Sequence, residues 1–285
     1  MRLIFFGSGY CSTFIIPLIG NYLEVICTHK NKIKVQAFDK NLKIKRILFD
    51  EFFDNSHELL NTSNIILNSI PPINEKDILV EKLKGIINKQ NSIKWYGYLS
   101  STSVYGDHGG KWVTEDTIPK PKTKRGIVRL NAEKQNLSLF KEYNLPVHIF
   151  RLPGIYGPGR SICEKIKTNP FVIKKEDHYF SRVHAKDIAY AIQASIDKPT
   201  PGEIFNLTDD LPERNDLVAD YAAKLMRIRL EKIDITDKRV GPKVLDFYKE
   251  NKKVSNTKIK NILSWSPKFK NYKIGISEIL RQSND

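Results

Sequence analysis

The sequence contains few cysteines and no long apolar run, and both absences narrow the class of protein. Cys11, Cys27 and Cys163 are odd in number and irregularly spaced, without a Cys-x-x-Cys pair or a nearby cluster of metal ligands. We therefore expect reduced thiols, a cytoplasmic protein and no metal site. No stretch approaches the roughly 20 apolar residues that a membrane span needs. The apolar N-terminus is interrupted by residues 7–12 and lacks a small-residue cleavage site, which argues against a signal peptide.

Acidic residues are scarce relative to basic ones, with 32 Asp and Glu against 47 Lys and Arg and a formal net charge of +15. Such an excess can indicate nucleic acid, an anionic membrane or an anionic ligand. The lysines are scattered among Asn and Ile, as in NKIKV and NLKIKRI, without a long basic run. Scattered charge gives only a diffuse field, so we interpret it as a solvated surface and expect neither nucleic acid nor a membrane as partner.

The order of apolar segments predicts the fold class. Short apolar runs bounded by turn residues are typical of buried parallel strands, and they lie at 2–6, 23–27, 64–70, 94–101 and 146–152. Between them, apolar residues return every three or four positions at 75–89 and 128–143, which predicts helices. Alternating strands and helices indicate an α/β Rossmann fold with a doubly wound parallel sheet.

The pattern loosens after residue 160, where we expect a helix at 185–196, a short strand at 203–207 and a helix at 213–227. We predict a dinucleotide-binding Rossmann domain over 1–160. Residues 161–285 would then hold the last sheet elements and a smaller lobe on the substrate side. Ligands of open α/β sheets bind beyond the carboxyl ends of the strands, so those loops are the places to search.

The loop after the first strand has the order of a dinucleotide fingerprint. Gly7 permits the tight turn, and Gly9 lets the backbone approach a pyrophosphate held by the following helix end. The third glycine of the motif is replaced by Ser12, and a plain turn is the alternative interpretation. The predicted cofactor contacts in this loop are Gly7, Ser8, Gly9, Tyr10 and Cys11.

The second strand is followed by Thr28, His29 and Lys30, where an NAD-selective site would offer a carboxylate to the ribose 2′-hydroxyl. A basic residue with a hydroxyl suits a 2′-phosphate instead, so we expect NADP as the cofactor and regard NAD as the alternative. Asp50 would contact the adenine amino group, or it is an ordinary surface residue.

Three further motifs carry a family resemblance. Residues 99–106 (LSSTSVYG), 151–160 (RLPGIYGPGR) and 180–189 (FSRVHAKDIA) resemble extended short-chain dehydrogenases/reductases, the NAD-dependent epimerase/dehydratase type. The resemblance extends over nearly the whole chain. It is closest to the YeeZ-like atypical subgroup, because of residues 69–72 (SIPP) and 104–107 (VYGD).

The resemblance implies further site residues. Ser101 occupies the position of the hydroxyl that contacts the substrate carbonyl or alcohol. The implied cofactor contacts are Ser69, Ile70, Pro71, Ser100, Pro153, Gly154 and Ile155. The implied substrate contacts are Thr102, Tyr156 and Arg160. Family members that bind nucleotide sugars often hold the diphosphate with an arginine at the position of Phe180. Arg182, two residues later, could pair with a substrate anion, and a structural ion pair with Asp187 is the alternative.

The family's catalytic Tyr-x-x-x-Lys pair is missing. Aligning residues 119–133 with the family motif puts Arg125 at the tyrosine and Arg129 at the lysine. Arginine stays protonated near neutral pH, so Arg125 cannot exchange the proton. It could hold an anionic substrate or stabilise an oxyanion, and Arg129 could bind the nicotinamide ribose. Solvated surface arginines are the alternative.

Four other phenols lie near strand ends, namely Tyr96, Tyr98, Tyr105 and Tyr156, but no pattern shows that one of them replaces the missing tyrosine. Two functions therefore stay open. The first is an NADP(H)-dependent oxidoreductase or epimerase-like enzyme acting on a small molecule, for which an anionic substrate suits the arginines. The second is a non-catalytic NADP(H)-binding sensor or scaffold. The resembled family commonly forms dimers, so a homodimer is compatible with either.

Overall fold

A computed structural model describes residues 1–20, 24–31, 41–54, 56–87 and 92–282. The chain divides into two compact units, each built from several segments. Unit 1 comprises Met1–Ser101, Ile127–Arg151 and Ile188–Phe205, and unit 2 comprises Thr102–Gly126, Leu152–Asp187 and Asn206–Asp285. The chain thus passes repeatedly between the units, whereas the sequence predicted a single boundary at residue 160.

A seven-stranded sheet forms the centre of unit 1, in the order β11-β7-β5-β4-β1-β2-β3. The paired strands from β3 to β5 run parallel, as predicted for a doubly wound Rossmann sheet. The strands are β1 (Arg2–Phe6), β2 (Glu24–His29), β3 (Ile44–Leu48), β4 (Ile65–Asn68), β5 (Trp95–Ser101), β7 (Val147–Leu152) and β11 (Ile204–Asn206).

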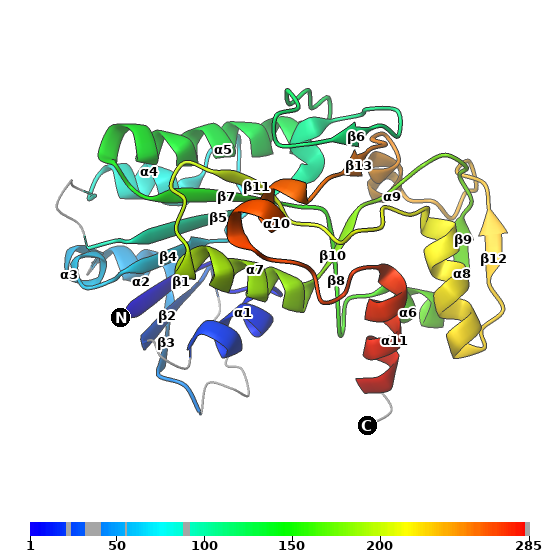
Figure 1. Cartoon of the computed structure of the whole chain (residues 1–285), viewed down its shortest axis with the longest axis horizontal. Coiled ribbons are helices and arrows are strands. Elements are labelled where there is room, and N and C mark those ends of the chain that lie inside the picture. Colours follow the sequence, from blue (N-terminus) through cyan, green and yellow to red (C-terminus); the bar gives the residue numbers. More distant parts are fainter. Residues whose placement is uncertain (21–23, 32–40, 55, 88–91, 283–285) are drawn as a thin grey trace. The chain divides into compact units, whose positions relative to one another are not determined.

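Helices cover both faces of this sheet, with α4 (Ile78–Lys84) and α5 (Lys124–Tyr143) on one side and α1 (Ser12–Ile19) and α7 (Ala185–Asp197) on the other (Figure 1). Short helices α2 (Phe49–Asp54) and α3 (Ser56–Asn61) follow β3. No helix in the described ranges is long and apolar enough to cross a membrane.

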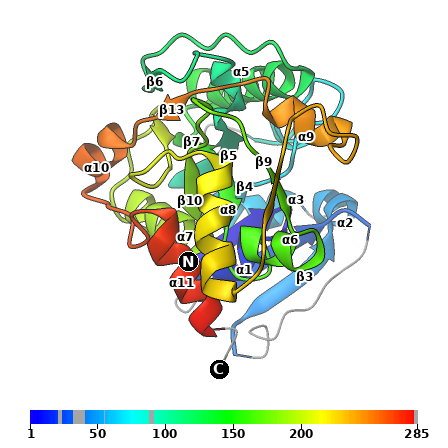
Figure 2. The ribbon, with the colours of Figure 1, turned by 90° about the vertical axis from the view of Figure 1, so that its right-hand side faces the viewer.

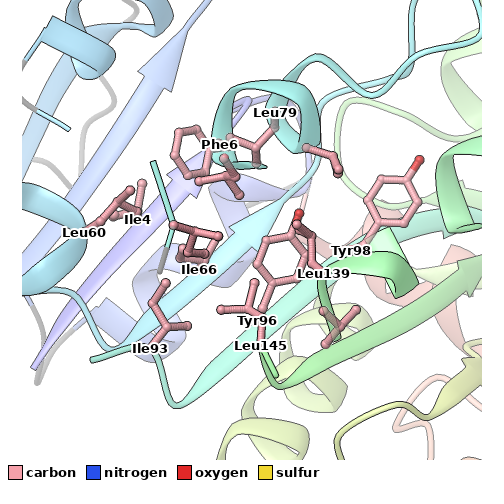
Figure 3. Packing of buried hydrophobic residues seen from close by; sticks show 14 of the residues in the cluster. Ile4, Phe6, Leu60, Ile66, Leu79, Ile93, Tyr96, Tyr98, Leu139 and Leu145 are labelled. Atoms are coloured by element: carbon pink, nitrogen blue, oxygen red, sulfur yellow. The ribbon is translucent and has the colours of Figure 1, made fainter. Parts of the chain in front are cut away.

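The core of unit 1 forms because the strands are apolar on both faces. Ile4, Ile66 and Tyr96 come from neighbouring strands and pack with Leu139 from α5 (Figure 3). These side chains are fully buried. Burying a large apolar side chain stabilises the fold by about 1.5–3 kcal/mol each, so this cluster fixes the strand ends that carry the loops.

Helix α4 is shorter than the predicted helix over 75–89. Asn74 and Glu75 have positive φ angles of 49° and 67°, which a right-handed helix excludes. Asp77 then caps the helix by accepting hydrogen bonds from the amides of Leu79 and Val80. Positions 88 and 89 of the prediction, like position 23 of the predicted second strand, lie outside the described residues.

Unit 2 contains three two-stranded parallel sheets: β8 (Gly154–Tyr156) with β10 (Arg182–His184), β9 (Phe171–Ile173) with β12 (Glu231–Ile233), and β6 (Trp112–Val113) with β13 (Lys253–Val254). Figure 2 shows α8 (Asn215–Met226) between α6 (Ile162–Thr168) and α11 (Tyr272–Gln282). Their apolar faces share one buried cluster, which includes Ile166, Val218 and Ile276. The remaining elements are the 3-10 helix η3 (Thr102–Tyr105), α9 (Pro242–Phe247) and α10 (Thr257–Leu263).

Candidate functional site

The glycine loop of unit 1 is built so that only glycine fits at position 7. Gly7 has a φ of 79°, and a Cβ added there would lie 2.9 Å from the Ile70 side chain. Its amide donates to the Thr28 hydroxyl at 3.2 Å, and the Ser8 amide donates to the Thr28 carbonyl at 3.1 Å. The loop is therefore fixed between the ends of β2 and β4, where dinucleotides bind in open α/β sheets.

Ser12 takes the place of the third glycine without disturbing the turn. Its side chain is buried and its hydroxyl donates to the Gly9 carbonyl at 2.6 Å. Helix α1 starts at this residue and ends at Ile19, two residues beyond Pro17. Tyr10 and Cys11 lie half-buried just before the helix, and Gly9 is exposed. The exposed edge of the loop and the positive end of a helix thus adjoin, which suits a pyrophosphate.

The end of β2 carries hydrogen-bonding and basic groups and no carboxylate from residues 28–31. The His29 ring is buried, with Nε2 placed 3.3 Å from the Ser8 hydroxyl. Arg46 on β3 donates to the same nitrogen at 3.2 Å. Lys30 is exposed. Arg46 is not predicted from the sequence, because only the pairing of β3 with β2 brings residue 46 beside this strand end.

Ser69 and Ile70, which were predicted as cofactor contacts after β4, lie directly against the glycine loop. Ser69 donates from its hydroxyl to the Gly7 carbonyl at 2.6 Å and from its amide to the Phe6 carbonyl at 2.9 Å. The Ile70 amide donates to the Asn68 side chain at 3.0 Å. Pro71 and Asp50 are exposed. The Ser-Ile pair therefore holds Gly7 in its unusual conformation.

The resemblance implies that Ser100 contacts the cofactor. In the structure its hydroxyl donates to the carboxylate of buried Glu133 at 2.6 Å. Glu133 also pairs with buried Arg151 at 2.8 Å. A buried ion pair is strongly coupled to its surroundings, because removal of one partner leaves an uncompensated charge. The Ser100 hydroxyl is thus engaged inside unit 1, while Ser101 lies half-buried at the last position of β5.

Arg129 on α5 contacts the C-terminal half of β5. Its guanidinium donates to the Tyr98 hydroxyl at 2.8 Å and to the Leu99 carbonyl at 3.1 Å. Tyr98 is fully buried, and burial raises the pKa of its phenol although the Arg129 charge acts in the opposite direction. Tyr98 is therefore poorly suited to replace the missing proton-exchanging tyrosine.

A second buried polar group surrounds the capping residue of α4. Asp77 accepts from the side-chain amides of Asn68 at 3.0 Å and Asn136 at 2.9 Å, and Tyr96 donates to the Asn136 oxygen at 2.6 Å. Burial raises the pKa of Asp77, and also that of Tyr96. Like Tyr98, Tyr96 is therefore poorly suited to exchange a proton with a substrate, and its buried ring contributes to the packing of the core.

In unit 2, Arg125 occupies the first turn of α5 and stacks on an aromatic ring of α9. Its guanidinium carbon lies 4.5 Å from the centroid of the Phe247 ring. Thr123 caps this turn by accepting from the Gly126 amide at 3.2 Å. A Cβ on Gly126 would lie 2.6 Å from the Ser103 carbonyl oxygen, so glycine lets the helix start approach η3 closely.

Arg182 does not form the ion pair with Asp187 that sequence analysis offered as its alternative role. Its guanidinium donates to the carbonyls of Phe180 at 2.8 Å and Glu213 at 2.9 Å, and to the Asn215 side chain at 3.3 Å. Asp187 instead accepts the amides of residues 268 and 269. That expectation is wrong because β10 turns Arg182 toward backbone acceptors.

The other residues predicted on the substrate side also lie in unit 2. Tyr156 is buried, its ring rests against Gly275, and burial raises the pKa of its phenol. Thr102 is buried in η3 and Arg160 is exposed. Of the predicted cofactor contacts in unit 2, Gly154 is exposed, and Pro153 and Ile155 are half-buried. Tyr105, one of the other phenols near strand ends, donates to the Asn206 side chain at 2.7 Å. No cluster of three or more His, Cys, Asp or Glu suited to a metal ion occurs in the described part of the chain.

The sheet order and the glycine turn after its first strand define a Rossmann-type α/β protein. The model of the NAD dependent epimerase/dehydratase family matches residues 81–208. A conserved protein of unknown function from Silicibacter pomeroyi DSS is 33% identical with a TM-score of 0.85, covering 99% of this chain and 98% of that one. The chain belongs to the NAD dependent epimerase/dehydratase family.

One further relative matches only part of this chain, and one further structure shares its fold. Protein YeeZ of Escherichia coli K12 is 36% identical over 115 residues, which span 39% of this chain and only 38% of YeeZ. A dTDP-glucose 4,6-dehydratase of Bacillus anthracis, solved in complex with NAD, has a TM-score of 0.78 at 18% identity, covering 100% of this chain and 96% of the dehydratase. This second likeness shows the shared fold alone.

Proposed function

We propose that the protein binds a nicotinamide dinucleotide, NADP(H) in preference to NAD(H), and acts as an oxidoreductase or epimerase-like enzyme on a small anionic substrate. The observation that carries the proposal is the conformation of Gly7, whose missing Cβ leaves the space against Ile70 that the turn requires. This turn and the start of α1 fit a pyrophosphate, so the residues present fit the cofactor.

The preference for NADP(H) rests on the end of β2. A 2′-phosphate needs donors and positive charge, whereas a free 2′-hydroxyl is usually held by a carboxylate. His29, Lys30 and Arg46 provide the first set, and residues 28–31 contain no carboxylate. The dehydratase with the same fold was solved with NAD, so cofactor choice is a property to measure on this chain.

The roles of the chain's own residues follow from their chemistry. A bound nicotinamide supplies the hydride or accepts it. Ser101 at the end of β5 would hydrogen-bond the substrate oxygen, and Arg125 would bind an oxyanion. Arg129 already donates to Tyr98 and Leu99, and we propose that its remaining donors serve the nicotinamide ribose.

Steady-state assays with NADPH and NADP⁺ across carbonyl compounds and nucleotide sugars test this function. We expect turnover with at least one anionic substrate, and a loss of roughly 10²-fold or more in Ser101→Ala if that hydroxyl takes part in catalysis. Ser138→Ala, a half-buried hydroxyl on α5, is the matched control and should leave the rate unchanged. An absence of turnover with every substrate would contradict the enzymatic part of the proposal.

The burial of the tyrosine side chains favours a second candidate, a non-catalytic NADP(H)-binding sensor or scaffold. Tyr96, Tyr98 and Tyr156 are buried and burial raises the pKa of each phenol, so none offers an accessible proton. A sensor must bind the oxidised and reduced cofactors with different affinities. Equal affinities together with no turnover would exclude both the enzyme and the sensor, and would leave only a cofactor-binding scaffold.

A further inference from the structure

The Phe247 ring lies against the Arg125 guanidinium. The two groups stack at 4.5 Å, and the Phe247 side chain, on the last residue of α9, is half exposed. A ring that covers the flat face of a guanidinium leaves the N–H edge pointing outward. Arg125 forms no hydrogen bond or ion pair with any residue that the structure describes, so this edge keeps its donors for a ligand.

Glu250, the acidic residue that follows α9, already has two polar partners. Glu250 accepts from the Thr123 hydroxyl at 2.8 Å and pairs with Lys252 at 2.7 Å. Both partners of this ion pair are nearly buried, with side chains 10% and 9% exposed. Lys252 also donates to the Gly106 carbonyl at 2.9 Å and lies close enough to Arg125 for the two positive charges to interact. Glu250 therefore does not neutralise Arg125.

The surrounding sequence adds positive charge. Lys120, Lys122 and Lys124 are exposed and have no ion-pair partner in the described ranges. Of these, Lys124 lies with Arg125 in the first turn of α5, where cations are unfavourable because that end carries the positive pole of the helix dipole. Fold stability therefore does not account for this arrangement, whereas a bound anion would offset the repulsion.

We infer that Phe247 is a positioning residue that holds Arg125 ready for the oxyanion of the substrate, and that α9 is therefore part of the substrate-binding apparatus. The inference rests on the proposed role of Arg125 in binding an anion. A pre-oriented guanidinium matches two oxygens of a carboxylate or phosphate at once, and less side-chain freedom is lost on binding.

Side-chain NMR tests the inference on the full chain, with inorganic phosphate as the probe. The Arg125 Nε–Hε signal is assigned by its absence in Arg125→Lys, and the Gly126 amide serves as a backbone reporter. We expect saturable shifts in the wild type and weaker phosphate binding in Phe247→Ala, by about two- to fivefold, the effect of losing one exposed cation–π stack. Phe247→Leu should behave like Phe247→Ala, and Phe247→Tyr like the wild type.

The volume-matched variants separate positioning from packing. Wild-type affinity in Phe247→Ala or in Phe247→Leu would overturn the inference, as would absence of phosphate-induced shifts at Arg125 in the wild type. NADPH titrations of the same samples report the proposed cofactor function separately. Unchanged NADPH affinity with lost phosphate shifts contradicts only the role of Arg125 and Phe247, whereas lost NADPH binding in the wild type contradicts the proposed function.

Discussion

The Arg129 guanidinium donates a hydrogen bond to the Tyr98 hydroxyl at 2.8 Å, which joins α5 to the central strand β5. In the alignment proposed from the sequence, position 129 corresponds to the family's lysine, which activates a catalytic tyrosine four residues earlier. Here the arginine contacts a different phenol, which is fully buried. Under that alignment the positive charge of the motif is kept at this position, and buried Tyr98 is poorly suited to replace the proton-exchanging tyrosine.

Removal of this phenol should therefore affect stability and leave cofactor binding intact. We expect Tyr98→Phe to lower the free energy of unfolding by about 1 kcal/mol, since Arg129 is half-buried and water can replace part of the lost bond. Urea denaturation measures the loss. NADPH affinity in Tyr98→Phe that falls by more than tenfold would show instead that Tyr98 belongs to the cofactor site.

The two glycines of the loop should respond differently to alanine. Gly7→Ala requires a positive φ and a clash with Ile70, so we expect a loss of about 1–2 kcal/mol in stability together with weaker dinucleotide binding. An added Cβ on Gly9 would meet only the Gly7 carbonyl at 3.9 Å. Gly9→Ala should thus fold like the wild type and still bind NADPH at least tenfold more weakly, because its methyl group occupies space for the pyrophosphate. Thermal denaturation and calorimetry on both variants check this difference.

Arg46 should determine the choice between NADP(H) and NADH. We expect Arg46→Ala to weaken NADPH binding by about tenfold or more through loss of a charge-assisted contact, while NADH binding changes little. Lys45→Ala, which removes an exposed charge on the same strand, is the control for the general effect of net charge. Equal weakening of both cofactors in Arg46→Ala would contradict a 2′-phosphate contact.

Stability should depend on pH through Asp209 in unit 2. Burial raises the pKa of this carboxyl to about 8, while the positive charge of Arg182 opposes the rise. The folded state therefore holds a proton that the unfolded chain releases near pH 4, so Asp209 lowers stability progressively as pH rises from about 4 to about 8. Asp209→Asn should remove this decline, and denaturation curves of wild type and variant across that range measure the difference. Parallel curves would show that Asp209 titrates normally.

The periodicity of the sequence was sufficient to predict the Rossmann sheet, because its buried strands are short, apolar and bounded by turn residues. Gly7, Ser69 and Ile70 were predicted from motifs and are joined in the structure by direct contacts. Arg46 and Phe247 were not predicted, since strand pairing and the approach of α9 bring them to their partners from distant positions.

Ser100 and Arg182 show the limit of motif transfer. Ser100 matches the family pattern, whereas Arg182 lies two residues after the family's arginine position, which holds Phe180 here. Their polar atoms bond Glu133 and backbone carbonyls respectively. A motif specifies a place on the sheet, whereas the hydrogen-bond partners depend on neighbours such as Arg151 and Glu213 that sequence spacing alone does not identify.

Calorimetric titration of the purified wild-type chain with NADPH tests the central claim most directly. The Gly7 turn, the start of α1 and the basic groups at the end of β2 predict a single saturable site with micromolar or tighter affinity for NADPH and weaker affinity for NADH. A chain that folds cooperatively and yet takes up neither dinucleotide would contradict the account.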